Sequence, residues 1–118
     1  MLRELLHGTL TTAGYNTITA ENGQHAWDKL NELLATGQPM EEKLQMIITD
    51  IEMPQMDGHH LTKKIKEHEK LKDLPVVIFS SLINPEMRRK GEALGAYAQI
   101  TKPEIEQLIG IIDKKIAV

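Results

Sequence analysis

The sequence predicts an α/β fold, a doubly wound parallel sheet with helices on both faces, and three observations support this. Short apolar runs alternate along the chain with segments whose apolar residues recur at helical spacing. Two of the runs, 44–50 and 74–81, have adjacent rather than alternating apolar residues, as expected for strands covered on both faces. The 118 residues suffice for a single core, so we expect one domain over 1–118.

The first half of the chain predicts helix, strand, helix, loop and strand in that order. The first helix is marked by Leu2, Leu5, Leu6 and Leu10, and Gly14 is placed to end it. Residues 15–20, YNTITA, are rich in β-branched side chains and predict a short strand. The second helix is marked by Ala26, Leu30, Leu33 and Leu34 and ends near Gly37. The polar interval 35–43 predicts a loop, and 44–50 predicts the next strand.

The second half repeats the alternation of helix and strand. Its first helix is marked by Leu61, Ile65 and His68. The strand at 74–81 follows, and then Asn84 and Pro85 form the start signal of a helix that Gly95 ends. Residues 98–101 predict the last strand. The last helix carries the apolar residues Ile105, Leu108, Ile109, Ile112 and Ile116. Because helices separate the strands, we expect the strands to pair in parallel.

Composition excludes several classes of function. The net charge of −3 gives no electrostatic reason to expect nucleic acid or an anionic membrane as a partner. The chain has no cysteine, which excludes disulfides and thiolate metal sites and fits a reducing cytoplasm. Its apolar runs are far shorter than a membrane-spanning helix requires. Adjacent His59 and His60 cannot share one face of a helix, so we expect no histidine metal site.

Three residues that can carry chemistry fall where predicted strands end. Asp50 closes one strand, Ser80 closes the next, and Lys102 follows the last. Because the carboxyl ends of parallel strands meet at one edge of the sheet, we expect the three side chains to share a rim. Asp50 can attack phosphorus as a nucleophile, while Ser80 and Lys102 can stabilise the phosphoryl oxygens. A hard divalent cation, of which Mg²⁺ fits best, would hold carboxylate and phosphate oxygens together.

The sequence around these residues resembles the receiver domains of two-component signalling systems. DIEMPQMDG at 50–58 has the phosphoacceptor pattern of that family: Asp, two variable residues, Met-Pro, two variable residues and Asp-Gly. PVVIFSS at 75–81 is similar to the fourth strand of the family with its hydroxyl residue, and ITKP at 100–103 to the fifth-strand lysine with its proline. The resemblance covers nearly the whole chain. It implies a five-stranded, flavodoxin-like sheet with strand order 2-1-3-4-5.

By this resemblance, Asp50 is the residue that a histidine kinase phosphorylates. Asp50 and the backbone carbonyl of Glu52 would bind Mg²⁺, Ser80 would donate to the phosphoryl group, and Lys102 would pair with it. Phosphorylation would switch a protein-interaction surface read by a downstream or covalently linked output domain. The run Ser-Ser-Leu-Ile-Asn at 80–84 is further similar to receivers of CheV-type chemotaxis coupling proteins, for which the output domain would be CheW-like. The implied location is the cytoplasm.

The sequence departs from the family pattern in three places. Receivers carry two adjacent acidic residues after a first, central strand, and these acids complete the Mg²⁺ shell; the sequence shows neither the strand nor the pair. We therefore expect 1–118 to be an N-terminally truncated receiver domain with unpaired edges in the middle of its sheet. Gln99 stands where an aromatic ring of the family flips inward. Glu104 stands where an apolar residue usually follows the proline.

Other functions remain open on the sequence alone. A pseudo-receiver would keep the fold as an interaction module without phosphorylation, and the missing acidic pair and Gln99 favour it. An aspartyl phosphatase would use Asp50 as nucleophile and needs a second aspartate two residues later, where Glu52 is a longer substitute. The chain has no room for a cap domain of such a phosphatase, so we expect no enzyme. A strand-ending aspartate can also be a simple turn residue, which the match over 50–58 disfavours.

Overall fold

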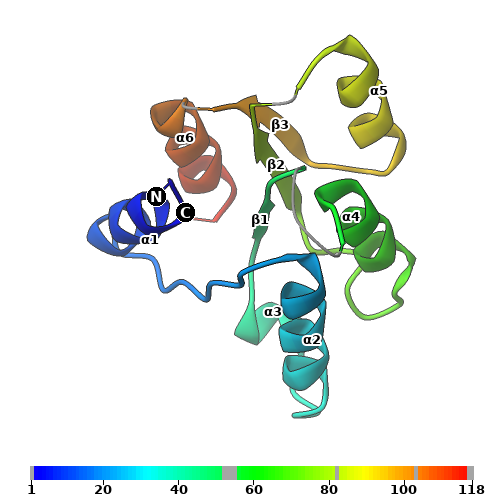
Figure 1. The fold of residues 1–118 in the computed structure, drawn as a ribbon. Helices are drawn as coiled ribbons and strands as arrows, with labels where there is room; N and C mark the ends of the chain where they lie inside the picture. Colours follow the sequence, from blue (N-terminus) through cyan, green and yellow to red (C-terminus); the bar gives the residue numbers. More distant parts are fainter. Residues whose placement is uncertain (1, 52–55, 82, 103, 117–118) are drawn as a thin grey trace.

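The structure, a computed structural model, describes residues 2–51, 56–81, 83–102 and 104–116. Within these residues, three helices come first, and strands and helices then alternate from β1 to α6 (Figure 1). The helices are α1 Leu2–Thr12, α2 Gly23–Leu34, α3 Met40–Lys43, α4 Gly58–Glu67, α5 Pro85–Ala93 and α6 Ile105–Lys115. The strands are β1 Ile47–Thr49, β2 Val76–Ser80 and β3 Ala98–Thr101.

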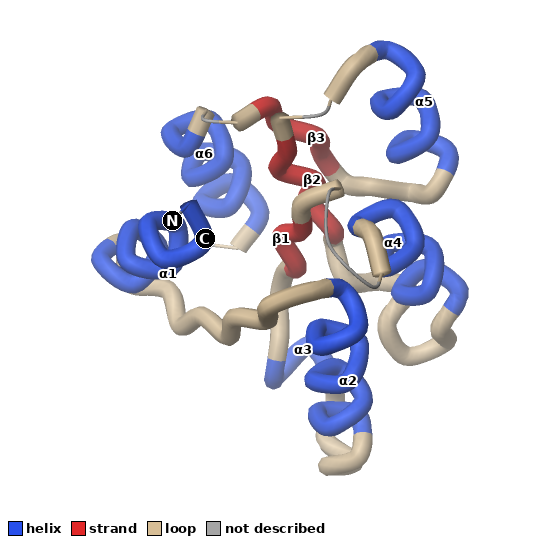
Figure 2. The backbone as a smooth tube through the Cα atoms, in the orientation of Figure 1, coloured by secondary structure: helices blue, strands red, loops and turns tan. Residues whose placement is uncertain are grey.

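The three described strands form one parallel sheet in the order β1-β2-β3. Ile47 pairs with Val76 at one side of the central strand, and Val77 pairs with Ala98 at the other. Figure 2 shows α1 and α6 together on one side of this sheet and α4 and α5 on the other. The predicted class, a parallel sheet covered by helices on both faces, is confirmed.

Two apolar clusters fill the space between sheet and helices. The first joins α2, α3 and α4 to the sheet, and its buried members are Leu30, Met40, Met56, Leu61, Ile65, Leu71, Leu74 and Val76. The second joins α1 and α6 to the opposite face, and its buried members are Leu10, Val77, Phe79, Ile100, Leu108 and Ile112. All five residues of β2 are buried, as the adjacent apolar residues of that strand predicted.

The predicted strand at 15–20 is wrong, because these residues form neither helix nor strand. A β-branched sequence favours a strand only where a neighbouring strand completes its hydrogen-bond ladder, and none of the three described strands pairs with 15–20. Side chains hold the segment instead. The Tyr15 hydroxyl donates to the Asp113 carboxylate on α6, and the Lys29 ammonium on α2 donates to the Thr19 carbonyl.

The loop predicted at 35–43 needs a smaller correction, because Met40–Lys43 forms the single-turn helix α3. Its backbone hydrogen bonds run from Glu42 N to Pro39 O at 3.1 Å and from Leu44 N to Met40 O at 2.8 Å. The turn brings Met40 into the first apolar cluster, where it is buried. A single turn is too short to leave a periodic signal in the sequence.

The predicted helix boundaries after β2 are confirmed in detail. The Asn84 side chain accepts a hydrogen bond from Met87 N at 2.8 Å, and Pro85 is the first residue of α5. Gly95 follows the helix with φ at +92°, a left-handed conformation that favours glycine. No helix in the part of the chain that the structure describes is long and apolar enough to cross a membrane.

Candidate functional site

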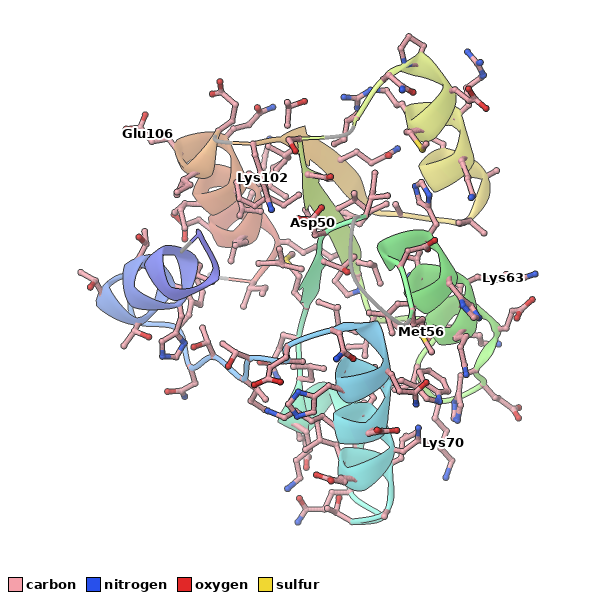
Figure 3. All side chains as sticks on the ribbon, viewed as in Figure 1. Asp50, Met56, Lys63, Lys70, Lys102 and Glu106 are labelled. Carbon is pink, nitrogen blue, oxygen red and sulfur yellow. The ribbon has the colours of Figure 1, made fainter. Side chains whose placement is uncertain are left out.

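The carboxyl ends of the three strands meet at one edge of the sheet, as their parallel pairing requires. Asp50 follows β1, Ser80 is the last residue of β2, and Lys102 follows β3. Figure 3 labels Asp50 and Lys102 and shows them close together at this edge. The structure therefore brings together the strand ends from which the sequence predicted a shared rim.

Asp50 and Lys102 form a salt bridge between the Asp50 carboxylate Oδ2 and the Lys102 ammonium. The other carboxylate oxygen, Oδ1, accepts a hydrogen bond from Ile51 N at 2.7 Å. The side chains of Asp50 and Lys102 are 27% and 24% exposed, so the pair is held by the protein but remains open to solvent. A carboxylate fixed at two oxygens and reachable from outside can meet an incoming electrophile.

Ser80 lies fully buried between these two residues in the strand order. Its backbone carbonyl accepts a hydrogen bond from Lys102 N at 3.1 Å, which continues the ladder past the paired residues Ser80 and Thr101. The backbone of Lys102 is therefore fixed directly to the end of β2. On the other side, the Thr49 hydroxyl donates to the Asp50 carbonyl at 3.0 Å.

The turn after Asp50 is closed by a close approach of two backbones. Gly58 N donates to Ile51 O at 3.0 Å, and Asp57 caps α4 by accepting from His60 N at 2.8 Å. A Cβ atom added at Gly58 would lie 1.8 Å from the Asp50 carbonyl oxygen. The Asp57-Gly58 pair is thus structural, and the glycine is required for α4 to begin against the end of β1.

Gly23 supports the same turn from α2 and was not found from the sequence. A Cβ atom on Gly23 would lie 1.9 Å from the carbonyl oxygen of Met56. The only signal was the pair Asn22-Gly23, in which Asn22 accepts from His25 N at 2.8 Å as the N-cap. A cap of this kind predicts where a helix starts, but does not show what the helix touches.

The rim of the sheet is where the family resemblance leads us to expect a metal ion. Within the described ranges, no three His, Asp or Glu side chains gather as a group that could hold a metal. The predicted second ligand, the carbonyl of Glu52, lies outside the described residues. Asp50 offers a hard oxygen with solvent access, and Mg²⁺ in phosphoryl-transfer sites often uses one or two carboxylates with phosphate oxygens and waters. The residues present therefore fit Mg²⁺ shared with a phosphoryl group.

Gln99 faces α5 from β3, two residues before Thr101 on the same face of the strand. Its side-chain nitrogen Nε2 donates to the Arg88 carbonyl of α5 at 2.9 Å. Glu104, the other departure from the family pattern near this strand, is exposed at the N-cap of α6. The amide of Gln99 thus links a strand and a helix through a hydrogen bond.

Comparison with known proteins decides the family. The family model for the response regulator receiver domain matches residues 1–113. The chain belongs to this family. Relatives of this receiver domain include the chemotaxis protein CheV3 of Helicobacter pylori, 29% identical over 113 residues, which cover 95% of the chain and 36% of CheV3. The two-component response regulator ARR17 of Arabidopsis thaliana is 39% identical over 108 residues, covering 86% of the chain and 68% of ARR17. The receiver domain thus spans about a third of the chemotaxis relative and two thirds of the plant relative.

Solved receiver structures share the fold. The chemotaxis protein CheY4 of Vibrio cholerae is 28% identical, with a TM-score of 0.80 over 98% of this chain and 89% of CheY4. The receiver domain of the sensor histidine kinase PA1611 from Pseudomonas aeruginosa is 20% identical, with a TM-score of 0.78 over 98% and 88% of the two chains, and holds a magnesium ion in its active-site cleft. The flavodoxin-like α/β fold that the resemblance implied is confirmed, and the described strands correspond to the last three of the order 2-1-3-4-5.

Proposed function

We propose that this receiver domain accepts a phosphoryl group on Asp50 from the phosphohistidine of a histidine kinase. The observation that carries the proposal is the Asp50–Lys102 salt bridge at a solvent-accessible strand end, with Ser80 on the strand between them. In this proposal the Asp50 carboxylate is the nucleophile, and the Ser80 hydroxyl and the Lys102 ammonium are the two oxygen-stabilising groups of phosphoryl transfer.

In the transfer, a carboxylate oxygen of Asp50 forms a bond to phosphorus while the bond from phosphorus to the donor imidazole nitrogen breaks. The Lys102 ammonium, which neutralises the free carboxylate, then pairs with a phosphoryl oxygen. The Ser80 hydroxyl donates to a second phosphoryl oxygen. Lys102 therefore neutralises charge before and after the reaction, and needs only a short displacement because its backbone is fixed to Ser80.

A bound Mg²⁺ would neutralise the phosphoryl oxygens, with Asp50 as the protein ligand that the described residues provide and the Glu52 carbonyl as a second one. The kinase is the phosphodonor partner, and the output partner is a downstream or covalently linked domain. The similarity to CheV3 supports a chemotaxis role. We further propose a CheW-like output domain and a location in the cytoplasm. Neither nucleic acid nor membrane is a proposed partner of this domain, given its net charge of −3.

A pseudo-receiver is the second candidate, because one specific observation favours it. Asp50 stands without a metal-holding cluster of three acidic or histidine residues among those described, so metal affinity would depend on the phosphoryl group. In that case the domain would keep its fold and its binding surfaces and remain unphosphorylated. A phosphatase is a weaker proposal, and release of phosphate from small phosphoesters would be its assay; we expect none.

Beryllofluoride, a mimic of a phosphoryl group on aspartate, tests the proposal. With Mg²⁺ raised until the response saturates, amide NMR signals of the residues between 80 and 104 should shift in the native chain. Asp50→Asn should abolish the shifts. Asp57→Asn is the matched control, because asparagine caps α4 as well as aspartate does and should leave the shifts in place. A native chain that does not respond would favour the pseudo-receiver.

A further inference from the structure

Helix α5 is attached to the molecule in a different way from its neighbours. Of the described residues, none in α5 belongs to either apolar cluster. The buried residue of α5 is Gly91, which has no side chain to contribute to a core. Most of the stability of a helix in a protein normally comes from packing of its apolar face, so another interaction must help to hold α5 in place.

That interaction is a polar latch, by which we mean the hydrogen bonds between α5 and Gln99 of β3. Gln99 Nε2 donates to the Arg88 carbonyl at 2.9 Å, and the Arg88 guanidinium donates back to the Gln99 carbonyl at 3.4 Å. The Gln99 amide also lies against Gly91, where an added Cβ atom would come within 2.3 Å of Gln99 Oε1. The absence of a side chain at Gly91 therefore makes room for the amide.

One buried polar atom at α5 lacks a hydrogen-bond partner among the described residues. It is Gln99 Oε1, which faces Gly91. Burying a polar atom without a partner is unfavourable, because the atom gives up its hydrogen bonds to water. Gln99 Oε1 would regain such bonds if α5 moved away.

We propose that α5 is a separately opening helix, latched to β3 by the Gln99 amide, and that its opening hydrates the Gln99 amide. The closed position is the one that the structure describes. Because α5 is the helix that follows β2 and its terminal Ser80, its opening is placed to respond to events at the rim. This last link rests on the proposed phosphorylation of Asp50, whereas the latch itself does not.

Amide hydrogen exchange on the full chain, read residue by residue by NMR, tests the latch. Gln99→Ala should make the amides of α5 exchange about fivefold faster, the size expected for one lost hydrogen bond, and should leave those of α4 and α6 unchanged. Gln107→Ala is the matched control, because Gln107 is an exposed glutamine on α6 and should change none of these rates.

Gly91→Ala gives the sharper result, because the two possible effects have opposite signs. Alanine favours a helix more than glycine does, so α5 amides would exchange roughly threefold slower if helix propensity alone decided. The proposal expects faster exchange, because the new methyl group displaces the Gln99 amide. In the Gln99→Ala background the methyl group has room, and the same substitution should slow exchange.

Slower exchange in Gly91→Ala with Gln99 present, or equal effects in both backgrounds, would overturn the latch. So would α5 amides that exchange only as fast as those of α4 and α6 in every variant. The measurement needs neither phosphate nor beryllofluoride. A negative result in the exchange experiment would not contradict the proposed phosphorylation of Asp50. Equally, an Asp50 that does not respond to beryllofluoride would not contradict the latch.

Discussion

Helices α5 and α6 both adjoin β3 in the chain, one before it and one after it, yet they are attached by different chemistry. Helix α6 buries Leu108 and Ile112 in an apolar cluster with Phe79 and Ile100 of the sheet. Helix α5 buries a glycine and is held by the amide of Gln99. Under the proposal that α5 opens separately, this difference gives the same strand a fixed face and a movable face.

Strand β3 is placed to transmit this difference, because it carries Gln99 and leads directly into Lys102. Its face toward α6 is held by buried apolar side chains. Their contacts have no preferred direction but require close packing without cavities. Its face toward α5 depends on a few directional hydrogen bonds, which can break one at a time. A change at Lys102 could therefore alter the α5 side while the α6 side keeps the sheet in register.

The largest expected effect tests the anchored side. Leu108→Ala should lower the free energy of unfolding by about 2–5 kcal/mol, because it opens a cavity at a fully buried position. Met87→Ala on α5, half-buried and outside both clusters, should cost about 1 kcal/mol or less. Urea denaturation followed by circular dichroism measures both values. Equal losses would mean that α5 and α6 are attached alike.

Ile112→Val, expected to lower the free energy of unfolding by about 0.5–1.5 kcal/mol, provides a milder variant of the Leu108→Ala change.

Features set by local sequence were predictable. The strand at 98–101 and the start of α5 at Asn84-Pro85 appear where the sequence predicted them, because cap residues and short apolar runs act over a few neighbours. The approach of Asp50 to Lys102 was predictable for a different reason, since parallel pairing alone brings strand ends together. Neither inference required knowledge of side-chain packing.

Features set by distant partners were not predictable. The segment 15–20 has strand-forming residues but no ladder to join, so its composition misled. The sequence gives no sign of a special role for Gly23 or Gly91, and the structure shows that each gives room to a carbonyl or an amide from elsewhere in the chain. The sequence showed that Gln99 replaces an aromatic residue of the family. Its role as a latch, however, depends on the absence of a side chain at Gly91, eight residues earlier.

A smaller expected effect is a pH dependence of the free energy of unfolding that arises from His59. Burial of the ring lowers the pKa of His59 below 6.5, the Lys90 charge lowers it further, and Asp57 opposes them. A lowered pKa contributes stability that is complete above pH 6.5 and is lost as pH falls through the pKa of the folded state. Urea denaturation at pH 7.5 and at pH 5 should show a greater loss for the native chain than for His59→Leu. Identical losses would place the acid sensitivity on other groups.

The smallest expected effect tests a second role of α6, which also holds the segment that precedes α2. The Tyr15 hydroxyl donates to Asp113 on α6, and this hydrogen bond, with burial and the carboxylate charge, raises the pKa of Tyr15 above 10.0. The stabilisation is therefore complete below pH 10 and is lost as pH rises through the pKa of the folded state.

Tyr15 and Tyr97 are the two tyrosines of the chain, so a Tyr97→Phe background leaves one phenol to titrate by ultraviolet absorbance. Asp113→Ala should lower the titration midpoint toward the ordinary value, while Lys114→Ala on the same helix should leave the phenol bonded to Asp113 with a raised pKa. An unchanged midpoint in Asp113→Ala would show that α6 does not hold the segment. Helix α6 would then be attached by apolar packing alone. It would still differ from α5 in the kind of interaction that holds it, but it would no longer secure an additional segment of the chain.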